Sequence, residues 1–405
     1  MPVIMTVEII KGLMLLFTSI QPNDYTSYMQ QANKISSGEM DYSKVTGESG
    51  PIAYPALHSY IYLFLELFWV NNGDMHTLLV KMMAFLAHIT TVYYAVRIYQ
   101  EAFKKDPKQA NILVLIMFSF TVTCLSLDHL FNDTFATMFN TIAIYNFVKG
   151  KNLTGVVLVA LAFNIKMNAI LILPAVYLVT SKSQGICIGT LYLFLVVLIQ
   201  IILGIPYLIN YPRPYLDASY NFGRRFSKSV IINWRVLPDE ILLSTLFAST
   251  MTICHFIVLA YMLFTRWIKS IPEGFKEISL YPFNPIPQFK SLDTYHVTEV
   301  FFLCNFTGIV FIRGLHTQFI LWFWYSIPFL LRNGLKSKYN FGIFGYLMIF
   351  NVLSYSYSSG RNDFTTILIQ PMHFWIMYLN LANSKDSLQE THYESVESSR
   401  SSSPT

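Results

Sequence analysis

An aspartate is the first residue of this chain whose type and position could do chemistry. Asp24 follows the first long apolar run and opens the segment Asp-Tyr-Thr-Ser-Tyr-Met-Gln, residues 24–30. A carboxylate at the boundary of a membrane can act as a general base and take a proton from an attacking hydroxyl. It can also cap the helix expected over residues 25–31, since aspartate is a preferred N-cap residue. The two roles are compatible, and we favour the catalytic one.

A turn rich in glycine and proline closes the same polar segment. The sequence Gly-Glu-Ser-Gly-Pro-Ile-Ala-Tyr-Pro occupies residues 47–55, and this spacing of glycine and proline fixes the backbone tightly. As a turn, the stretch is sufficiently explained. As a functional element it would form the wall of an acceptor groove, where Glu48 and Tyr54 are the candidate substrate contacts.

Further polar side chains lie near the ends of apolar runs, where an ionisable group is costly to place and is therefore a functional candidate. They are Asp128, His129, Asn132, Asp133, Lys166, Asn168, Arg224, Arg225, Trp234, Arg235, Arg313 and His316. Structural roles compete for several of them. Asn132 or Asp133 could cap the following helix, Trp234 could anchor the chain at the interface, and His316 could be a hydrogen-bonded residue at a helix end.

Lys166 lies midway through an apolar stretch, so it must reach the surface, pair with an acid or meet an anion. Arg224, Arg225 and Arg235 offer further cationic groups for a phosphate. Cations that face one cavity together with a carboxylate suit a phosphate leaving group opposite a base. We therefore expect these four residues to bind a substrate, and the ion pair of Lys166 with an acid such as Asp133 stays open as the structural alternative.

The elements that must position these residues are membrane helices. Of the 405 residues, 54% are hydrophobic and only 13% are charged, which indicates an all-α integral membrane protein. The net charge of +5 lies in short loops, which suits topology signalling better than nucleic-acid binding. The four cysteines lie in apolar runs without metal-ligand or disulfide spacing.

Apolar runs able to cross a bilayer, for which a helix needs about 20 residues, recur along the chain. They occupy residues 3–20, 78–99, 111–127, 134–148, 186–204, 241–265, 297–313, 315–332, 339–357 and 364–381. Residues 153–180 are too long for one span, and we expect two short helices folded as a hairpin with Lys166 at its lumenal end. Residues 57–72 are short and carry Glu66, so we place them along the interface.

The positive charges of the loops then predict about twelve spans with both termini in the cytosol. Residues 1–383 form the membrane domain, with a first lumenal loop over 21–77 and a long lumenal loop over 205–240. Residues 384–405 form a polar, disordered cytosolic tail. The candidate site residues gather on the lumenal side.

Several of these segments, in this order, resemble the dolichyl-phosphate-mannose-dependent α-1,3-mannosyltransferases of the asparagine-linked glycosylation pathway. The segments are 24–29, Tyr42 with 47–56, 130–133 (Leu-Phe-Asn-Asp), 166–168 (Lys-Met-Asn), 233–238 (Asn-Trp-Arg-Val-Leu-Pro) and 313–319 (Arg-Gly-Leu-His-Thr-Gln-Phe). The likeness runs from about residue 22 to 380. It implies a polytopic GT-C glycosyltransferase of the endoplasmic reticulum membrane, with its active site facing the lumen.

The resemblance also implies substrates and roles. The donor would be dolichyl phosphate mannose and the acceptor Man5GlcNAc2-diphosphodolichol, with direct, inverting transfer. Asp24 matches the family's first-loop acid, and Lys166 matches its Lys-Met-Asn segment. We expect no cofactor and no essential metal, because a lipid monophosphate needs less charge neutralisation than a nucleotide diphosphate. Loose association with other glycosylation enzymes would fit this pathway.

Other functions remain open from the residues themselves. A related GT-C enzyme could use the same donor on another acceptor. A polytopic lipid or sugar transporter would show internal repeats and polar groups near the bilayer midplane, and the sequence shows neither. A non-catalytic scaffold would leave Asp24 and Lys166 without a reason.

Overall fold

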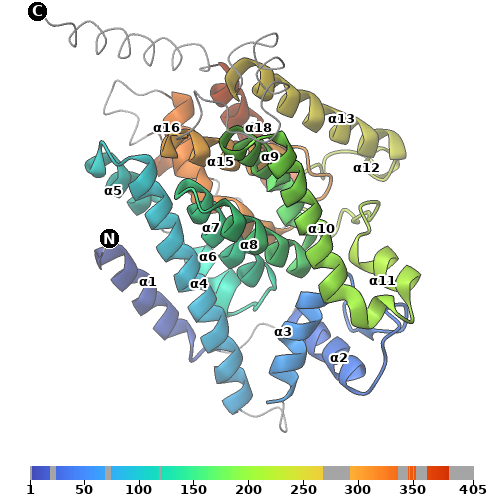
Figure 1. Cartoon of the computed structure of the whole chain (residues 1–405). Coiled ribbons are helices and arrows are strands. Elements are labelled where there is room, and N and C mark those ends of the chain that lie inside the picture. Colours follow the sequence, from blue (N-terminus) through green and yellow to red (C-terminus); the bar gives the residue numbers. More distant parts are fainter. Residues whose placement is uncertain are drawn as a thin grey trace, which may run out of the picture.

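The computed structural model describes residues 2–18, 24–68, 74–117, 120–267, 292–335, 345, 347–349, 351–352 and 363–382. Within these residues the chain is mostly helical, and its strands are the short pair β1 (Thr46–Gly47) and β2 (Gly50–Pro51). The expected helical architecture is confirmed (Figure 1). The predicted tail over 384–405 lies outside the described residues, as does most of the run over 339–357.

Three stretches of the described residues are long and apolar enough to cross a membrane. They are Thr77–Ala102 within α4 (Asp74–Ala102), Ile186–Leu208, which is α10, and Thr245–Trp267, which joins α13 (Thr245–Met262) to a π-helical turn. Large apolar side chains on α10 and α13, such as Phe194 and Phe256, are exposed, as expected for surfaces that face lipid. These stretches support an integral membrane protein, and the total of about twelve spans stays a prediction.

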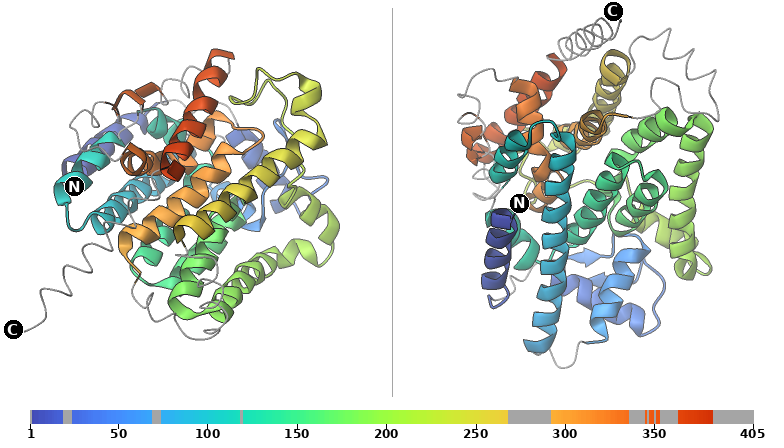
Figure 2. Two further views of the ribbon diagram at one scale, coloured as in Figure 1. Left: turned by 90° about the horizontal axis from the view of Figure 1, so that it is seen from above. Right: turned by 60° about the vertical axis from the view of Figure 1, so that its left-hand side comes forward.

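The centre of the molecule is a bundle in which α4 packs against α7 (Asp133–Val148) and α7 packs against α8 (Asn152–Ile165). The next layer contains α15 (Thr294–Val310), whose residues from Val297 to Val310 are all buried. A helix that is buried on every side belongs to the core of the fold. The right-hand view of Figure 2 shows the orange and red C-terminal helices toward the top and the blue first-loop helices at the bottom.

Several further helices surround this bundle. They are α1 (Pro2–Leu15), α5 (Pro107–Ile116), α6 (Phe120–Leu127), α12 (Asp239–Leu242) and α18 (Asp363–Ala382). Helix α1 packs against α4 and α6, and α18 packs against α15.

The hairpin predicted for residues 153–180 is confirmed. Helix α8 ends at Ile165, Lys166 is extended, and a short 3₁₀ helix (Met167–Ile172) leads into α9 (Leu173–Gln184). The amide of Asn152, at the start of α8, donates to Ser183 Oγ at 2.9 Å and to Gln184 Oε1 at 3.2 Å. The two outer ends of the hairpin therefore lie together, and Lys166 lies at its turn.

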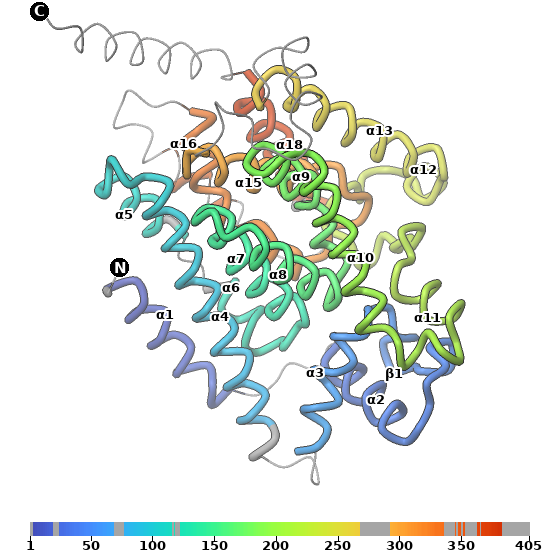
Figure 3. Tube along the Cα trace, in the orientation of Figure 1, coloured from blue at the N-terminus to red at the C-terminus, as the bar shows by residue number. Residues whose placement is uncertain are grey.

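The first loop folds as a compact layer at one end of the molecule, formed by α2 (Asp24–Ser36), the strand pair and α3 (Ala56–Glu66). Figure 3 traces β1 close to α2 and to α11 (Pro212–Ser219). The start of helix α3 contacts the hairpin, because the backbone N–H of Leu57 donates to Asn164 Oδ1 at 2.7 Å. Two hydrogen bonds join α11 to the loop, from Ala56 N to Tyr215 Oη and from Ser219 Oγ to Tyr54 O, each 3.2 Å long.

The glycine positions of this loop have a steric cause. A Cβ at Gly47 would lie 2.4 Å from Ser27 Oγ, so a larger residue would force strand and helix apart. Gly50 has φ +120°, a conformation that residues with a side chain rarely adopt. The Gly-x-x-Gly-Pro segment therefore makes a tight turn on α2, as its sequence predicts.

The run over 315–332, expected as one continuous span, is not a continuous helix. Two 3₁₀ segments (Thr317–Trp322 and Trp324–Ser326) precede α16 (Ile327–Leu335). The Tyr99 hydroxyl donates to Tyr325 O at 2.8 Å and accepts from Phe329 N at 2.9 Å. A side chain inserted between these two groups replaces the helical hydrogen bond that would join them, and this breaks the helix.

Candidate active site

A cavity of about 490 Å³ opens between the first loop and the hairpin turn. Its walls come from the start of α2, from residues 49–54, from the turn after α8 and from two later segments over 221–230 and 312–322. Among the predicted site residues, those that line it are Asp24, Tyr54, Lys166, Asn168, Arg224 and His316. Six side chains that are distant in sequence thus share one cavity.

Asp24 is the first residue of α2, so the helix begins one residue earlier than predicted. Its carboxylate Oδ2 accepts a hydrogen bond from Tyr28 Oη at 3.4 Å, and Tyr28 Oη lies 3.3 Å from Tyr54 Oη. Burial raises the pKa of the Tyr28 phenol, so this group stays a neutral donor beside the carboxylate. Tyr28, one helical turn after Asp24, therefore orients the Asp24 carboxylate, which faces the cavity.

Lys166 both pairs with an acid and lines the cavity. Its ammonium Nζ donates to Asp133 Oδ2 at 2.6 Å and to Asn132 Oδ1 at 3.1 Å. The rings of Tyr54, Phe319 and Trp322 surround it, with centroids 5.3–5.7 Å from Nζ. The structural alternative considered for Lys166 is thus realised, and the lysine keeps a face toward the cavity.

Asn132 and Asp133 form a buried support behind the cavity rather than part of its lining. Asp133 also accepts a hydrogen bond from Trp322 Nε1. The amide of Asn132 donates to His58 Nδ1 at 3.1 Å. Burial, and then the charge of Lys166, lowers the pKa of His58, so its imidazole is neutral and Nδ1 can accept. Asn132 and Asp133 therefore position the Lys166 ammonium at the cavity wall and do not line the cavity themselves.

Two arginines supply cations to the cavity wall. The guanidinium of Arg224 lies 5.3 Å from the centroid of the Phe226 ring, and its N–H groups have no hydrogen-bond acceptor among the described residues. Arg313 donates to Phe222 O at 2.6 Å and also lines the cavity. With Lys166 there are three cations against the carboxylates of Asp24 and Asp133. This excess of positive charge favours an anionic ligand.

Four predicted site residues have their side chains elsewhere. Glu48 accepts from Gln30 Nε2 at 2.9 Å on the exposed side of α2. Arg225 donates to Leu243 O and Thr245 Oγ1 at the start of α13. Arg235 donates to Lys228 O and forms an ion pair with Asp363. The indole Nε1 of Trp234 donates to Ile312 O. The contacts of Arg225, Trp234 and Arg235 hold the 205–240 segment against the bundle. None of the four residues lines the cavity.

The remaining polar candidates divide in the same way. Asn168 lines the cavity and is 7% exposed, and its Oδ1 has no hydrogen-bond partner among the described residues. His316 lines the cavity with its ring against Phe226, at a centroid distance of 4.5 Å. Asp128 instead pairs with the buried Lys81 at 3.1 Å. Asn168 therefore belongs to the cavity wall, with its Oδ1 atom buried and without a partner in the described structure.

Sequence reasoning missed Tyr28 and Trp322, and it noted Arg313 by position only. Tyr28 could have been found, because a residue four positions after Asp24 lies on the same face of a helix. Trp322 belongs to a run that was expected to span the membrane as one helix, so its contact with Asp133 could not be anticipated. Within the described part of the chain, no group of three or more His, Cys, Asp or Glu side chains could hold a metal ion.

Comparisons with known proteins bear on this site. Residues 2–362 match the model of a family described as ALG3 protein. A Neurospora crassa protein named Dol-P-Man:Man(5)GlcNAc(2)-PP-Dol alpha-1,3-mannosyltransferase is 33% identical over 77% of this chain and 72% of its own length. A Dictyostelium discoideum protein, given the same name as a probable function, is 26% identical over 88% and 84%. A human protein of that name is 27% identical over 76% and 69%.

Among solved structures, ArnT from Cupriavidus metallidurans bound to undecaprenyl phosphate is similar, with 12% identity and a TM-score of 0.43 over 94% of this chain and 76% of ArnT. The family match extends over most of the chain, and it includes every residue that lines the cavity. The chain therefore belongs to the ALG3 protein family.

Proposed function

We propose that this protein transfers mannose from dolichyl phosphate mannose to Man5GlcNAc2-diphosphodolichol and forms an α-1,3 linkage. The relatives' names support the donor, the acceptor and the linkage. The observation that carries the proposal is that Asp24 shares one cavity with Arg224, Arg313 and Lys166. A base and a cluster of cations in one cavity are what transfer from a lipid phosphate requires.

The reaction we propose is a single displacement with inversion. The 3-hydroxyl of the accepting mannose attacks C1 of the donor mannose on the face opposite the phosphate. The new C1–O bond forms as the bond from C1 to the phosphate oxygen breaks, and Asp24 takes the hydroxyl proton. Dolichyl phosphate leaves with the bonding electron pair.

The leaving phosphate gains charge in this step, and cations placed beside it stabilise that charge. Arg224 is our first candidate because its N–H groups are not used within the described structure. Arg313 and Lys166 contribute charge from the same wall, although Lys166 shares its charge with Asp133. We propose no essential metal, since these side chains supply the positive charge that a monophosphate needs.

The setting of this reaction is part of the proposal. We place the chain in the endoplasmic reticulum membrane as a polytopic GT-C enzyme, with the first loop and the cavity on the lumenal side. Both substrates are lipid-linked and approach within the bilayer. The three membrane-capable stretches support an integral protein, and the gathering of α2, α3 and α11 at one end supports one catalytic face.

A transfer assay tests the function directly. Purified protein receives dolichyl phosphate mannose and Man5GlcNAc2-diphosphodolichol in excess EDTA, and the product is analysed by mass spectrometry and by linkage-specific mannosidase digestion. We expect one added mannose in α-1,3 linkage. Another linkage or another preferred acceptor would identify a related enzyme of the same class, and activity that appears only with added Mn²⁺ or Mg²⁺ would contradict the metal-free proposal.

A further inference from the structure

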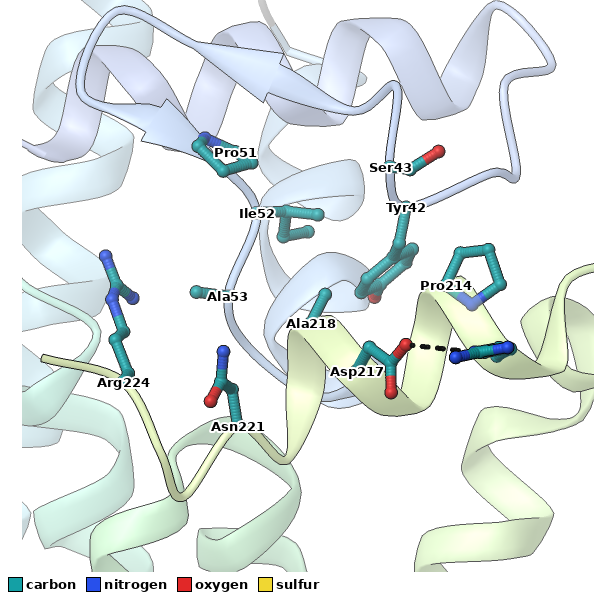
Figure 4. A pocket seen from close by; sticks show the side chains of 11 residues that line it. Tyr42, Ser43, Pro51, Ile52, Ala53, Pro214, Asp217, Ala218, Asn221 and Arg224 are labelled. Carbon is teal, nitrogen blue, oxygen red and sulfur yellow. Dashed lines mark ion pairs between the residues drawn. The ribbon is translucent and has the colours of Figure 1, made fainter. Parts of the chain in front are cut away.

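A second cavity, of about 550 Å³, lies beside the first one between the glycine-proline turn and α11. Figure 4 shows it from close by, with Pro51 and Ile52 on one side and Pro214 and Ala218 on the other. Its volume falls within the range of about 300–1,000 Å³ that is typical of ligand sites. Nothing in the reaction described above uses this cavity.

The two cavities are adjacent and share part of their lining. Ala53, Asn221 and Arg224 line both of them. A ligand whose reacting group lies at Asp24 can therefore have its next groups beside Ala53, at the second cavity. The second cavity then receives the part of the ligand that lies beyond the reacting sugar.

The lining of the second cavity suits a neutral sugar. Pro51 and Pro214 offer apolar surfaces on which the C–H face of a pyranose can pack. Asp217 and Asn221 stand at its edge and can accept from, or donate to, sugar hydroxyls. Asp217 pairs with Arg213 at 3.6 Å, the contact dashed in Figure 4, and both side chains are largely exposed.

Neither the phosphate nor the lipid fits this cavity as well. Since Asp217 pairs with Arg213, Arg224 is, among the described residues of this lining, the one cation without an acidic partner there, and in the first cavity Arg224 is joined by Arg313 and Lys166, which makes that cavity the better phosphate site. A polyprenyl chain needs a continuous apolar surface, and the edge here carries Arg213, Asp217, Asn221 and Arg224.

We infer that the second cavity binds mannose residues of the acceptor glycan beyond the one that is mannosylated. This inference rests on the proposed function, and it makes the cavity the determinant of acceptor size. Contacts that are equal in the ground state and the transition state change KM and leave kcat unaltered. The cavity should therefore act on KM for the acceptor.

Kinetics with two acceptors test this. Asp217→Asn removes the charged acceptor, and Ala218→Trp fills the cavity. With Man5GlcNAc2-diphosphodolichol we expect each variant to raise acceptor KM by about tenfold, with kcat and donor KM near those of the unaltered protein. With an acceptor trimmed to its accepting mannose arm, the same variants should change KM little. Glu240→Gln, on the exposed helix α12, is the matched control. Unchanged KM for the full acceptor in both variants would overturn the inference and leave the proposed function standing.

A binding measurement separates the two ideas. A cysteine introduced by Ala218→Cys is labelled with a maleimide in the presence of free Man5GlcNAc2 oligosaccharide, with Glu240→Cys as the control. We expect the oligosaccharide to slow labelling at position 218 and not at position 240. Protection without any mannose transfer by the unaltered protein would support the glycan site and refute the transfer function, and absence of protection would refute the site.

Discussion

Lys166 and Asp133 form an ion pair with 2.6 Å between Nζ and Oδ2, at the point where the hairpin turn meets the start of α7. The Asp133 side chain is fully buried, and Lys166 is 7% exposed as a residue. Because an unpaired charge is costly in such a place, the pair fixes the turn relative to α7. The same lysine lines the cavity, so one side chain both stabilises the hairpin turn and supplies a positive charge to the candidate site.

Lys166→Met should lower stability, because it leaves the Asp133 carboxylate buried without its partner. We expect a loss of about 3–5 kcal/mol in the free energy of unfolding, the usual cost of breaking a buried pair. Thermal unfolding of the purified variant measures this. A variant as stable as the unaltered protein would show that the pair does not hold the turn.

The double variant Lys166→Met/Asp133→Asn provides the control for this prediction. It removes both charges and keeps an acceptor for Trp322 Nε1, so most of the lost stability should return. We expect both Lys166→Met and the double variant to have a raised donor KM and a lowered kcat, since each lacks the cation. Normal turnover by a stable double variant would assign Lys166 to structure alone.

Tyr28→Phe should lower kcat and leave both KM values close to normal, because Tyr28 positions Asp24 without touching substrate. The expected decrease is about 3–10-fold, which corresponds to one hydrogen bond. Tyr62→Phe is the control, since Tyr62 belongs to the same ring cluster but its hydroxyl donates to Leu130 O. Equal kinetics for the two variants would remove Tyr28 from the site.

Arg224→Gln and Arg225→Gln form a matched pair of neighbours with different surroundings. Arg224 lines the cavity, whereas Arg225 donates to Leu243 O and Thr245 Oγ1. We expect Arg224→Gln to lower kcat/KM for the donor by about 10–100-fold, through loss of a charge-assisted contact with phosphate. Arg225→Gln should retain kcat/KM and lose some thermal stability. The reverse pattern would move the phosphate site to Arg225.

The sequence predicted the parts of the site that depend on local signals. The length of the 153–180 stretch and its interrupting lysine predicted the hairpin, and Asp24 was identified from its place after an apolar run. The choice of Arg224 over Arg225 could not be predicted, because adjacent residues carry the same charge and only packing against α13 and Phe226 distinguishes them. The break near Trp322 depends on Tyr99, which lies more than 200 residues earlier.

The orientation of the chain gives a separate prediction. Lys105 follows α4, and the neighbouring Glu101 pairs with Lys149 at 3.0 Å, so two basic clusters lie at the same end of the bundle. Loops rich in lysine stay in the cytosol. In sealed microsomes whose outer face is cytosolic, a cysteine introduced by Lys105→Cys should react with an impermeant thiol reagent. A cysteine introduced by Glu48→Cys should resist labelling, and the opposite pattern would invert the predicted topology.

The central claim is that Asp24 is the base of the transfer reaction, and the transfer rate of purified Asp24→Asn tests it most directly. The substitution keeps the size of the side chain and removes its ability to take a proton. We expect kcat to fall by about 10²–10⁴-fold, while the variant stays folded and binds dolichyl phosphate mannose with normal affinity. Near-normal turnover by Asp24→Asn would reduce Asp24 to a structural residue of α2 and contradict the account.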